Sequence, residues 1–352
     1  MLRYIIKLYK FIILGIIFVY FANAFARGSS DHAGLALEVS EILEKNNLVE
    51  IKNLQNKGKW SDSISILQPL FVKQPKSIPV VLGLANALTH LGRRQEALAI
   101  LFEATQWAKG AQKIFFIRRI RVLSRLFLNN KTFQTYQDGL KLILAKKYRN
   151  AIERFERSLG DEPENVEVLV RLGQSFILAD DSEKALQFLI FAKKLNPFDS
   201  EINLWLGRAF QKTGQINDAL LEFRIACDGL KKSEQAIFWL AESLVASGQV
   251  LGAIRILERD FKIFPFHLLT LISAIKLRLQ MPYSESQILW TARKNLQHAL
   301  SHFTEYQRLT TESEHLLEFG VALNGSPQDI KNEIQRLIQQ VGSRFDDSVL
   351  KH

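Results

Sequence analysis

The sequence predicts an all-α solenoid, in which short helix-turn-helix units stack on one another. One pattern returns with a 34-residue period between residues 132 and 267, and no gap is needed to align its four copies. The same offset separates two weaker copies between residues 44 and 111. Apolar residues inside each copy recur at helical spacing, and a unit of this length cannot bury its apolar face alone. Stacked neighbouring units must therefore form the core.

The repeated columns contain residues whose size suits two closely packed helices. The first half of each unit carries a small residue: Gly139, Gly173, Gly207 and Ala241. The second half carries another small residue: Ala151, Ala185, Ala219 and Ala253. A bulky apolar column follows: Phe155, Leu189, Phe223 and Leu257. Because small side chains let helix axes approach, we expect the first two columns to mark the helix crossing within each unit.

The unit that begins at Val166 shows the expected element order. Residues 167–179 carry apolar side chains at helical spacing and predict a first helix with one buried stripe. Residues 182–195 predict a second helix. Asn196-Pro197 ends it, because proline lacks the amide hydrogen and disfavours helical geometry in the residue before it.

At these residues the chain resembles the tetratricopeptide repeat family. The unit from Val166 supplies the motif residues Leu169, Leu172-Gly173, Phe176, Ala185, Ala192 and Pro197. The unit from Ser200 supplies Leu206-Gly207, Phe210, Gly214, Ala219, Phe223 and Ala226. The copies depart from the motif at Asp138, Ser158, Asp180, Leu189, Lys231, Ala241 and Asp260. The resemblance implies a right-handed superhelix of helix-turn-helix repeats that binds other proteins or peptides.

The N-terminal segment, residues 1–26, has the regional order of a secretory signal peptide. Three basic residues precede the apolar run 11–21, and small residues at 22–26 offer cleavage sites. The run is shorter than the roughly 20 residues that span a bilayer. The alternative is an uncleaved inner-membrane anchor over residues 4–26. Both interpretations predict an exported protein that faces the periplasm or lies in the cell envelope.

The remaining segments are assigned around the two blocks of repeats. Residues 27–43 form a lead-in, and residues 44–111 form the two weaker repeats. Residues 112–131 do not fit the period and predict a spacer helix. Four repeats occupy residues 132–267. Residues 268–352 predict a helical C-terminal cap, with helices near 268–279, 286–303, 305–320 and 326–341.

The spacer helix is basic. The window 104–137 holds seven Lys or Arg residues and no Asp or Glu, in a chain whose formal net charge is +10. The candidate basic patch comprises Lys113, Arg118, Arg121 and Arg125. It predicts either a site for an acidic partner, such as a membrane surface or an acidic protein, or a packed spacer with a solvated basic face. Export and the lack of a binding motif disfavour nucleic acid.

The sequence offers no catalytic residue and no cofactor site. It lacks a phosphate-binding glycine loop, a dinucleotide fingerprint and a zinc-protease motif. The pair His298 and His302, with Glu305, has helical spacing, but such spacing often arises by chance and predicts no metal site. Cys227 excludes an intramolecular disulfide, because it is the single cysteine, and is expected to pack as a small apolar residue.

The resemblance implies that the first helices line a concave groove. The residues it places there are Tyr136, Val170, Gln174, Leu204, Arg208, Phe238 and Glu242. The chain lacks the Lys and Asn with which family members clamp a peptide carboxylate, so an extended or helical peptide held in side-chain pockets is favoured. Alternatively, apolar members such as Val170 and Leu204 only pack against neighbouring helices.

The predicted function is a non-enzymatic scaffold or adaptor of the bacterial cell envelope, which binds partner peptides or proteins in the groove. The alternative is a membrane-associated component of an envelope assembly or secretion machine, whose activity lies in residues 286–352. Partner capture by a fragment without these residues would distinguish the two.

Overall fold

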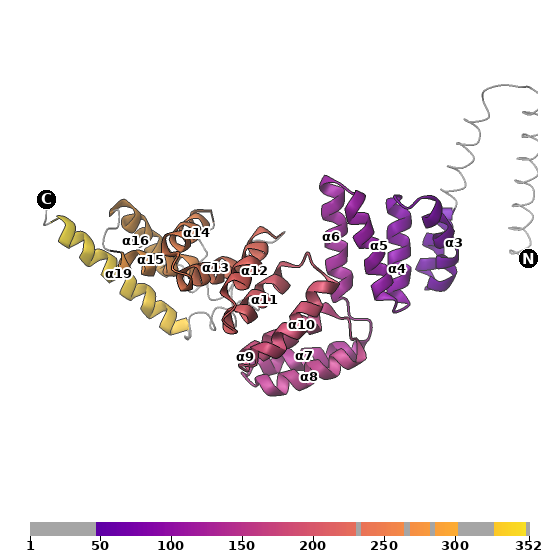
Figure 1. Ribbon diagram of the computed structural model, residues 1–352, viewed down its shortest axis with the longest axis horizontal. Helices are drawn as coiled ribbons and strands as arrows, with labels where there is room; N and C mark the ends of the chain where they lie inside the picture. The colour runs from indigo at the N-terminus through magenta and orange to yellow at the C-terminus, as the bar shows by residue number, and fades with distance from the viewer. Residues whose placement is uncertain (1–46, 230–233, 264–267, 282–285, 302–326, 350–352) are drawn as a thin grey trace, which may run out of the picture. The chain divides into compact units, whose positions relative to one another are not determined.

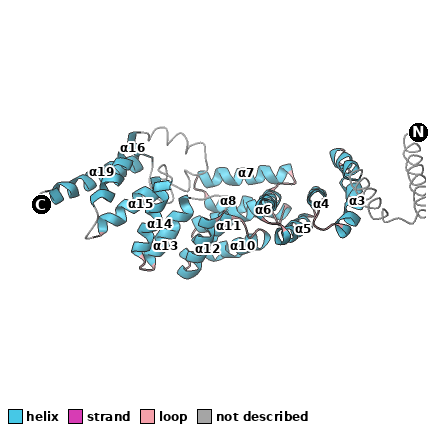
Figure 2. Cartoon of the chain, turned by 90° about the horizontal axis from the view of Figure 1, so that it is seen from above, coloured by secondary structure: helices cyan, strands magenta, loops and turns pink. Residues whose placement is uncertain are grey.

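The computed structural model describes residues 47–229, 234–263, 268–281, 286–301 and 327–349. These residues form helices joined by short turns, and no strand occurs among them (Figure 2). The all-α class expected from the sequence is therefore confirmed. The signal or anchor segment 1–26, the lead-in 27–43 and the helix expected at 305–320 lie outside the described residues.

The chain divides into two compact units, Met1–Ile100 and Leu101–His352, and the boundary falls inside α5 (Arg94–Trp107). The first unit contains a helix at residues 47–56, followed by α3 (Trp60–Lys73) and α4 (Ile78–His90). The amide of Gln55 donates to the carbonyl of Gly83 at 2.9 Å. Ser63, which replaces an alanine of the repeat, is fully buried, and its hydroxyl donates to the carbonyl of Trp60 at 2.7 Å.

The second unit alternates two kinds of helix (Figure 1). The first helices are α7 (Asn130–Leu144), α9 (Val166–Leu178), α11 (Ser200–Lys212), α13 (Glu234–Ala246) and α15 (Leu268–Gln280). The second helices are α8 (Tyr148–Asp161), α10 (Ser182–Leu195), α12 (Ile216–Asp228), α14 (Val250–Ile263) and α16 (Ser286–Ser301). The helix α6 (Gly110–Arg125) precedes this series, and α19 (Pro327–Val349) follows it.

The period is visible in the helix boundaries themselves. The helices α9, α11, α13 and α15 begin at residues 166, 200, 234 and 268, and each contains 13 residues. The helix α15 thus continues the spacing of the repeat after the repeated columns have faded from the sequence. Each first helix packs on the second helix that follows it, and from α9 onwards also on the second helix of the preceding unit.

The small columns lie at the closest approaches between helices. A β-carbon added to Gly139, Gly173 or Gly207 would stand 2.5 to 2.7 Å from the side chain of Phe155, Leu189 or Phe223, respectively. The alanines of the second small column, at 151, 185, 219 and 253, have no exposed surface. The steric roles expected for both columns are therefore confirmed.

Two departures from the repeat motif are compensated by hydrogen bonds. Ser158 is fully buried, and its hydroxyl donates to the carbonyl of Thr132 at 3.0 Å. Asp260 is also buried and accepts a hydrogen bond from the hydroxyl of Thr270 at 2.9 Å. Since buried polar groups need partners, Ser158 is tolerated by a bond within its own unit and Asp260 by a bond to the first helix of the next unit.

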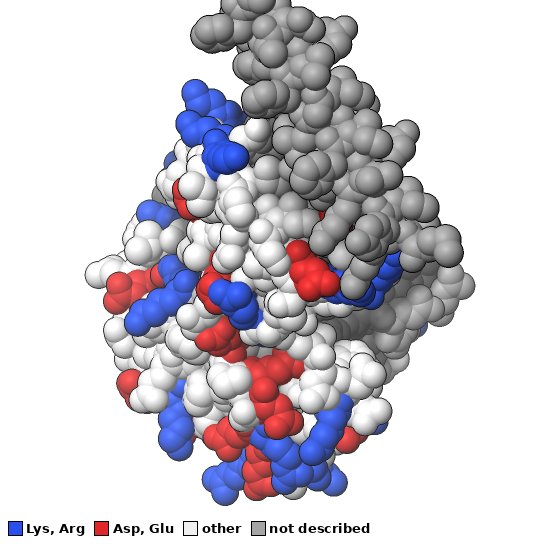
Figure 3. All heavy atoms as spheres, turned by 90° about the vertical axis from the view of Figure 1, so that its right-hand side faces the viewer, with Lys and Arg blue, Asp and Glu red and all other residues white. Residues whose placement is uncertain are grey.

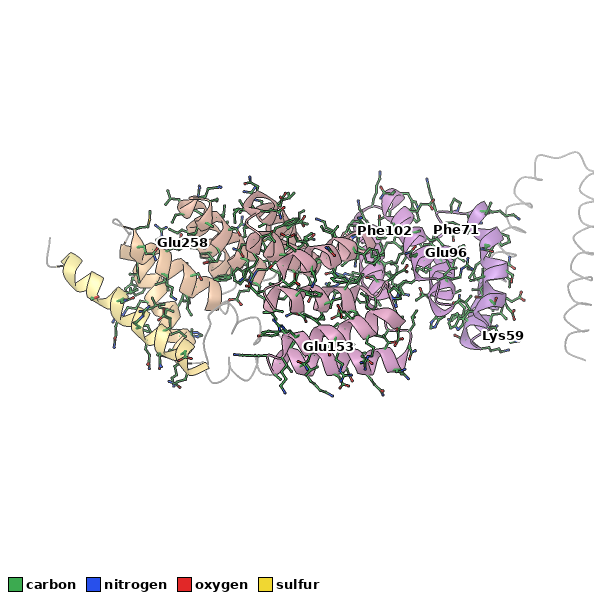
Figure 4. All side chains as sticks on the ribbon, turned by 60° about the horizontal axis from the view of Figure 1, so that its bottom comes forward. Lys59, Phe71, Glu96, Phe102, Glu153 and Glu258 are labelled. Atoms are coloured by element: carbon green, nitrogen blue, oxygen red, sulfur yellow. The ribbon has the colours of Figure 1, made fainter. Side chains whose placement is uncertain are left out.

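The helix α19 completes the core at the C-terminal end. Its residues Ile334, Leu337 and Val341 are buried, and the helix packs on α15 and α16. It continues to Val349, past the end expected at residue 341. Between α14 and α15, the guanidinium of Arg278 donates to both carboxylate oxygens of Glu258, which is labelled in Figure 4.

Candidate functional site

The groove residues named from the sequence lie on successive first helices, and most of them are buried. Tyr136, Val170, Gln174, Leu204, Arg208 and Phe238 expose between 0 and 6% of their surface, whereas Glu242 is exposed. Val170 has no exposed surface at all, so the packing alternative holds for it and a partner cannot reach it in this conformation. Leu204 and Phe238 belong to the apolar core of the C-terminal repeats.

The basic helix α6 packs on α9, and its last residue, Arg125, reaches acids at the starts of α9 and α11. The guanidinium of Arg125 pairs with Glu167, with Asp199 at 2.8 Å and with Glu201 at 2.8 Å. We call these three acids the carboxylate cluster. Beside it, the amide of Asn196 donates to the hydroxyl of Ser124 at 3.0 Å. One end of the predicted groove is therefore occupied by the Arg125 side chain of the same protein.

The start of each first helix places the carboxylate cluster. Asp199 caps α11, and its carboxylate accepts a hydrogen bond from the backbone N–H of Glu201. Glu167 and Glu201 are the second residues of α9 and α11, where acids also interact favourably with the helix dipole. Because the two glutamates occupy the same position in consecutive units, stacking brings them to the same face.

A second arginine extends the cluster along α9. The guanidinium of Arg171 pairs with Glu167 at 3.1 Å and with Glu201 at 3.2 Å, and it donates to the side-chain oxygen of Gln174. The hydroxyl of Tyr136, on α7, donates to Glu167 at 2.7 Å. These bonds account for the burial of Tyr136 and Gln174 and link α7, α9 and α11 with α6.

The network determines the charge states of its members. Burial acts to raise the pKa of Glu167, but Arg171 and Arg125 together with the hydrogen bond from Tyr136 lower it from 4.5 to about 2. Burial lowers the pKa of Arg125, and the three carboxylates more than reverse that effect, so its pKa is raised. Burial and the neighbouring Glu167 raise the pKa of Tyr136. The glutamate and the arginine therefore remain charged, and the tyrosine remains a hydrogen-bond donor, at neutral pH.

The candidate basic patch is divided by this arrangement. Arg125 is largely buried in the network, and Arg121 lies 3.7 Å from Asp199. Lys113 and Arg118 are exposed on α6. The expectation that all four basic residues form one patch needs correction. The carboxylate cluster comes from distant parts of the sequence and neutralises the C-terminal end of the patch, at Arg121 and Arg125. On the face drawn in Figure 3, basic and acidic side chains are interspersed.

The first helices beyond the cluster present a different arrangement. The guanidinium carbon of Arg208 lies 3.3 Å from the ring centroid of Trp239, a cation–π contact between α11 and α13. Partial desolvation of its carboxyl group by the surrounding protein raises the pKa of Glu242, although its side chain reaches the surface, and Lys276 acts in the opposite direction. Lys276, on α15, pairs with Glu333 of α19 at 2.8 Å.

The sequence did not reveal Glu167, Asp199, Glu201, Arg171 or Trp239 as parts of this surface. A usable signal was present for two of them, because Glu167 and Glu201 recur at the spacing of the repeat. Phe102, labelled in Figure 4, was also missed; its ring lies 5.9 Å from that of Phe198 and joins α5 to the loop before α11.

The histidine pair considered for metal binding lies only partly within the described residues. His298 lies exposed on α16, while His302 and Glu305 are outside the described part of the chain. In the part that the structure describes, no group of three or more His, Cys, Asp or Glu residues could hold a metal ion. Within the same residues, no helix combines the length and the apolar character needed to cross a bilayer. Burial raises the pKa of the Cys227 thiol to about 12, as expected for a packed cysteine.

Residues 142–202 match the family model of the tetratricopeptide repeat. This range covers α8, α9 and α10 and reaches the first turn of α11. The resemblance noted at the repeated columns is thereby confirmed. None of the curated proteins matches the chain.

Several solved structures of repeat proteins are similar to this chain. MamA, residues 41 to the end, from Desulfovibrio magneticus RS-1 is 18% identical, with 52% of this chain and 92% of that chain covered and a TM-score of 0.35. YrrB, described as a TPR protein with an unusual peptide-binding site, is 20% identical over 58% of this chain and 95% of its own, with a TM-score of 0.36. A tetratricopeptide repeat protein from Parabacteroides merdae ATCC 43184 is 13% identical, with coverages of 84% and 98% and a TM-score of 0.39.

Proposed function

Because the chain is a tetratricopeptide repeat protein, we propose that it is a non-enzymatic scaffold or adaptor of the bacterial cell envelope that binds a partner peptide or protein along its first helices. Repeats of this fold typically serve protein interaction rather than catalysis. The basic, apolar and small-residue regions of segment 1–26 support the envelope setting.

One observation carries the proposed binding surface. Arg208, Glu242 and Lys276 occupy the same position of three consecutive repeats, on the neighbouring first helices α11, α13 and α15. We call this row the charged ladder. Its acid is exposed, and 42% of the Lys276 side chain is accessible.

The surroundings of the charged ladder suggest the chemistry of the partner. Leu204 and Phe238 stand one helical turn before Arg208 and Glu242 and belong to the buried apolar core. Glu242 offers a carboxylate to a basic or hydrogen-bond-donating group of the partner. The half-buried ring of Trp239 adds an apolar contact beside it. Such a combination suits a peptide that carries a basic residue close to an apolar one.

A charge reversal tests this surface. We expect Glu242→Lys to weaken capture of the main partner from envelope extracts, measured by affinity capture and mass spectrometry, by at least about tenfold, or about 1.4 kcal/mol. Asp218→Lys, on the exposed side of α12, makes the same charge change away from the ladder and is the control. If both variants lose partner capture equally, or both retain it, the charged ladder is not the binding surface. If the unaltered chain captures no envelope protein, the proposed scaffold function is wrong.

A further inference from the structure

The helix α6 has a second apolar face, which the repeats do not cover. Its residues Phe116, Ile120 and Leu123 are buried. On another side of the helix, Phe115 and Val122, together with Leu126 directly after its last residue, expose 39 to 54% of their surface. Their spacing of seven and four positions places them on one stripe of the helix.

The exposed apolar surface extends beyond this stripe. Ile114 flanks it on α6, and Leu128 and Phe133 are exposed just after the helix, in the connection to α7 and in its first turn. Six large apolar side chains between positions 114 and 133 are thus accessible to solvent. Exposed apolar residues that gather in this way mark interaction sites, whereas single ones need no explanation.

Positive charge accompanies the apolar residues. Lys113 and Arg118 lie on α6, and Lys109 and Lys131 lie just before α6 and in the first turn of α7; all four are exposed. None of the four forms an ion pair with an acid in the described part of the chain. No Asp or Glu occurs between residues 104 and 137. The surface therefore suits a negatively charged partner.

The position of Arg118 distinguishes a lipid surface from an acidic helix. This residue stands between Phe115 and Val122 along the exposed stripe, where a partner helix would bury its guanidinium within the seam. At a bilayer the long side chain instead extends to the phosphate groups while its neighbours enter the acyl boundary. Two further apolar side chains, Leu128 and Phe133, are exposed after the end of α6, where a single helix pairing with α6 would not cover them.

We propose that the outer face of α6, formed by Phe115, Arg118, Val122 and Leu126 with Lys113, is a peripheral site for anionic phospholipid membranes. The apolar side chains insert at the boundary between head groups and acyl chains, and the basic side chains contact lipid phosphates. The carboxylate cluster holds α6 in place because it binds Arg125, the last residue of the helix. This site is separate from the charged ladder, so either proposal can fail without the other.

The test reads the environment of α6 directly. The full chain with Cys227→Ser and Val122→Cys is labelled with an environment-sensitive NBD fluorophore. It is mixed with vesicles of phosphatidylcholine and phosphatidylglycerol, or of phosphatidylcholine alone. We expect the emission to move to shorter wavelength with the anionic vesicles only and the effect to decline with added salt. A probe at Leu251→Cys, equally exposed on α14, should not respond.

Charge variants complete the experiment. Lys113→Gln with Arg118→Gln should lower the apparent vesicle affinity, read from the probe at position 122, about tenfold or more. Arg149→Gln with Arg154→Gln, two exposed positions on α8, removes the same charge and should leave the affinity unchanged. The N-terminal segment is the same in every variant. A probe at 122 that ignores anionic vesicles, or that responds equally to neutral ones, overturns the proposal, as does equal loss in both charge variants.

Discussion

The Cγ atom of Leu189 lies 2.5 Å from the point where a β-carbon on Gly173 would stand. The two residues belong to the first and second helices of one repeat. Phe155 stands in the same relation to Gly139, and Phe223 to Gly207. Each glycine is therefore required because the partner side chain fills the space that a β-carbon would occupy, and not because of its backbone angles.

Gly173→Ala should lower the free energy of unfolding by about 1 to 3 kcal/mol, because the new methyl group would overlap a fully buried leucine. Chemical denaturation measures the change. Gly160→Ala is the matched control, since it is also helical and no atom lies within 4 Å of its added β-carbon. There we expect a gain of about 0.5 to 1 kcal/mol from the lost flexibility of glycine.

Adding Leu189→Ala to Gly173→Ala tests the cause. The smaller side chain makes room for the methyl group, so the double variant should be less destabilised than the sum of the single changes. Strict additivity would show that the two residues do not compete for the same space.

Lys146 turns the chain between α7 and α8 with a φ of 55°, in the left-handed region. The equivalent turns of later repeats have Asp180, Gly214 and Gly248. Left-handed geometry costs a non-glycine residue about 1 to 2 kcal/mol, which exceeds the flexibility cost of glycine. We expect Lys146→Gly to stabilise the protein by up to about 1 kcal/mol and Gly214→Ala to destabilise it by a similar amount. Thermal unfolding that gives the same sign for both would contradict this account.

Arg125→Gln should destabilise the second unit by about 3 to 5 kcal/mol, because it removes the cation shared by three largely buried acids. Arg171 still pairs with Glu167 and Glu201, which favours the lower end of that range. Hydrogen exchange should increase most in α6 and at the starts of α9 and α11. Arg154→Gln, an exposed change on α8, should stay within about 0.5 kcal/mol of the unaltered protein. A similar small effect for Arg125→Gln would show that the network does not hold α6.

The same network predicts sensitivity to acid. The pKa of Glu167 is about 2 in the folded protein and 4.5 without its neighbours. A lowered pKa means that the unfolded chain binds the proton first, so this contribution to stability is complete above pH 4.5 and is lost as the pH falls towards 2. Glu167→Gln should make unfolding less dependent on pH in that interval, as measured by denaturant titrations. An unchanged pH dependence would show that Glu167 is not the responsible group.

Leu204→Ala and Phe238→Ala should each lower the free energy of unfolding, by about 2 to 5 kcal/mol. Both side chains are buried in the apolar core, so truncation leaves cavities rather than empty binding pockets. Calorimetry checks stability, and partner capture by the folded fraction checks binding. If the variants keep normal stability but no longer capture the partner, both residues belong to the binding surface and not to the core.

The sequence predicted the repeat accurately, because each column depends on contacts within one unit or between adjacent units. Gly173 and Ala185 are small for reasons that the window of a single repeat contains. Ser158 and Asp260 were identified as departures from the motif, but their hydrogen-bond partners were not predicted. A helix near residues 268–279 was expected only as part of the C-terminal cap, although α15 begins where a further copy of the repeat would begin.

The candidate site was less predictable. The charges on α6 look like a solvated patch in the local sequence, and their partners Glu167 and Asp199 lie 42 and 74 residues away from Arg125. Those acids also have an adequate local role, because they stand at helix starts. The burial of Leu204 and Phe238 likewise depends on how far neighbouring repeats overlap, which one sequence cannot fix.

The long separation between Arg125 and its partners also sets an order of events during synthesis. The arginine is synthesised 74 residues before Asp199, a delay of roughly 4 to 15 s at ordinary translation rates. During that interval α6 has neither of the acids from α11 to hold it, whereas α7 and α8 already pack on each other. The ion pairs that hold α6 therefore form only after α9 and the start of α11 have been synthesised, so the position of α6 is fixed by residues that follow it in the chain.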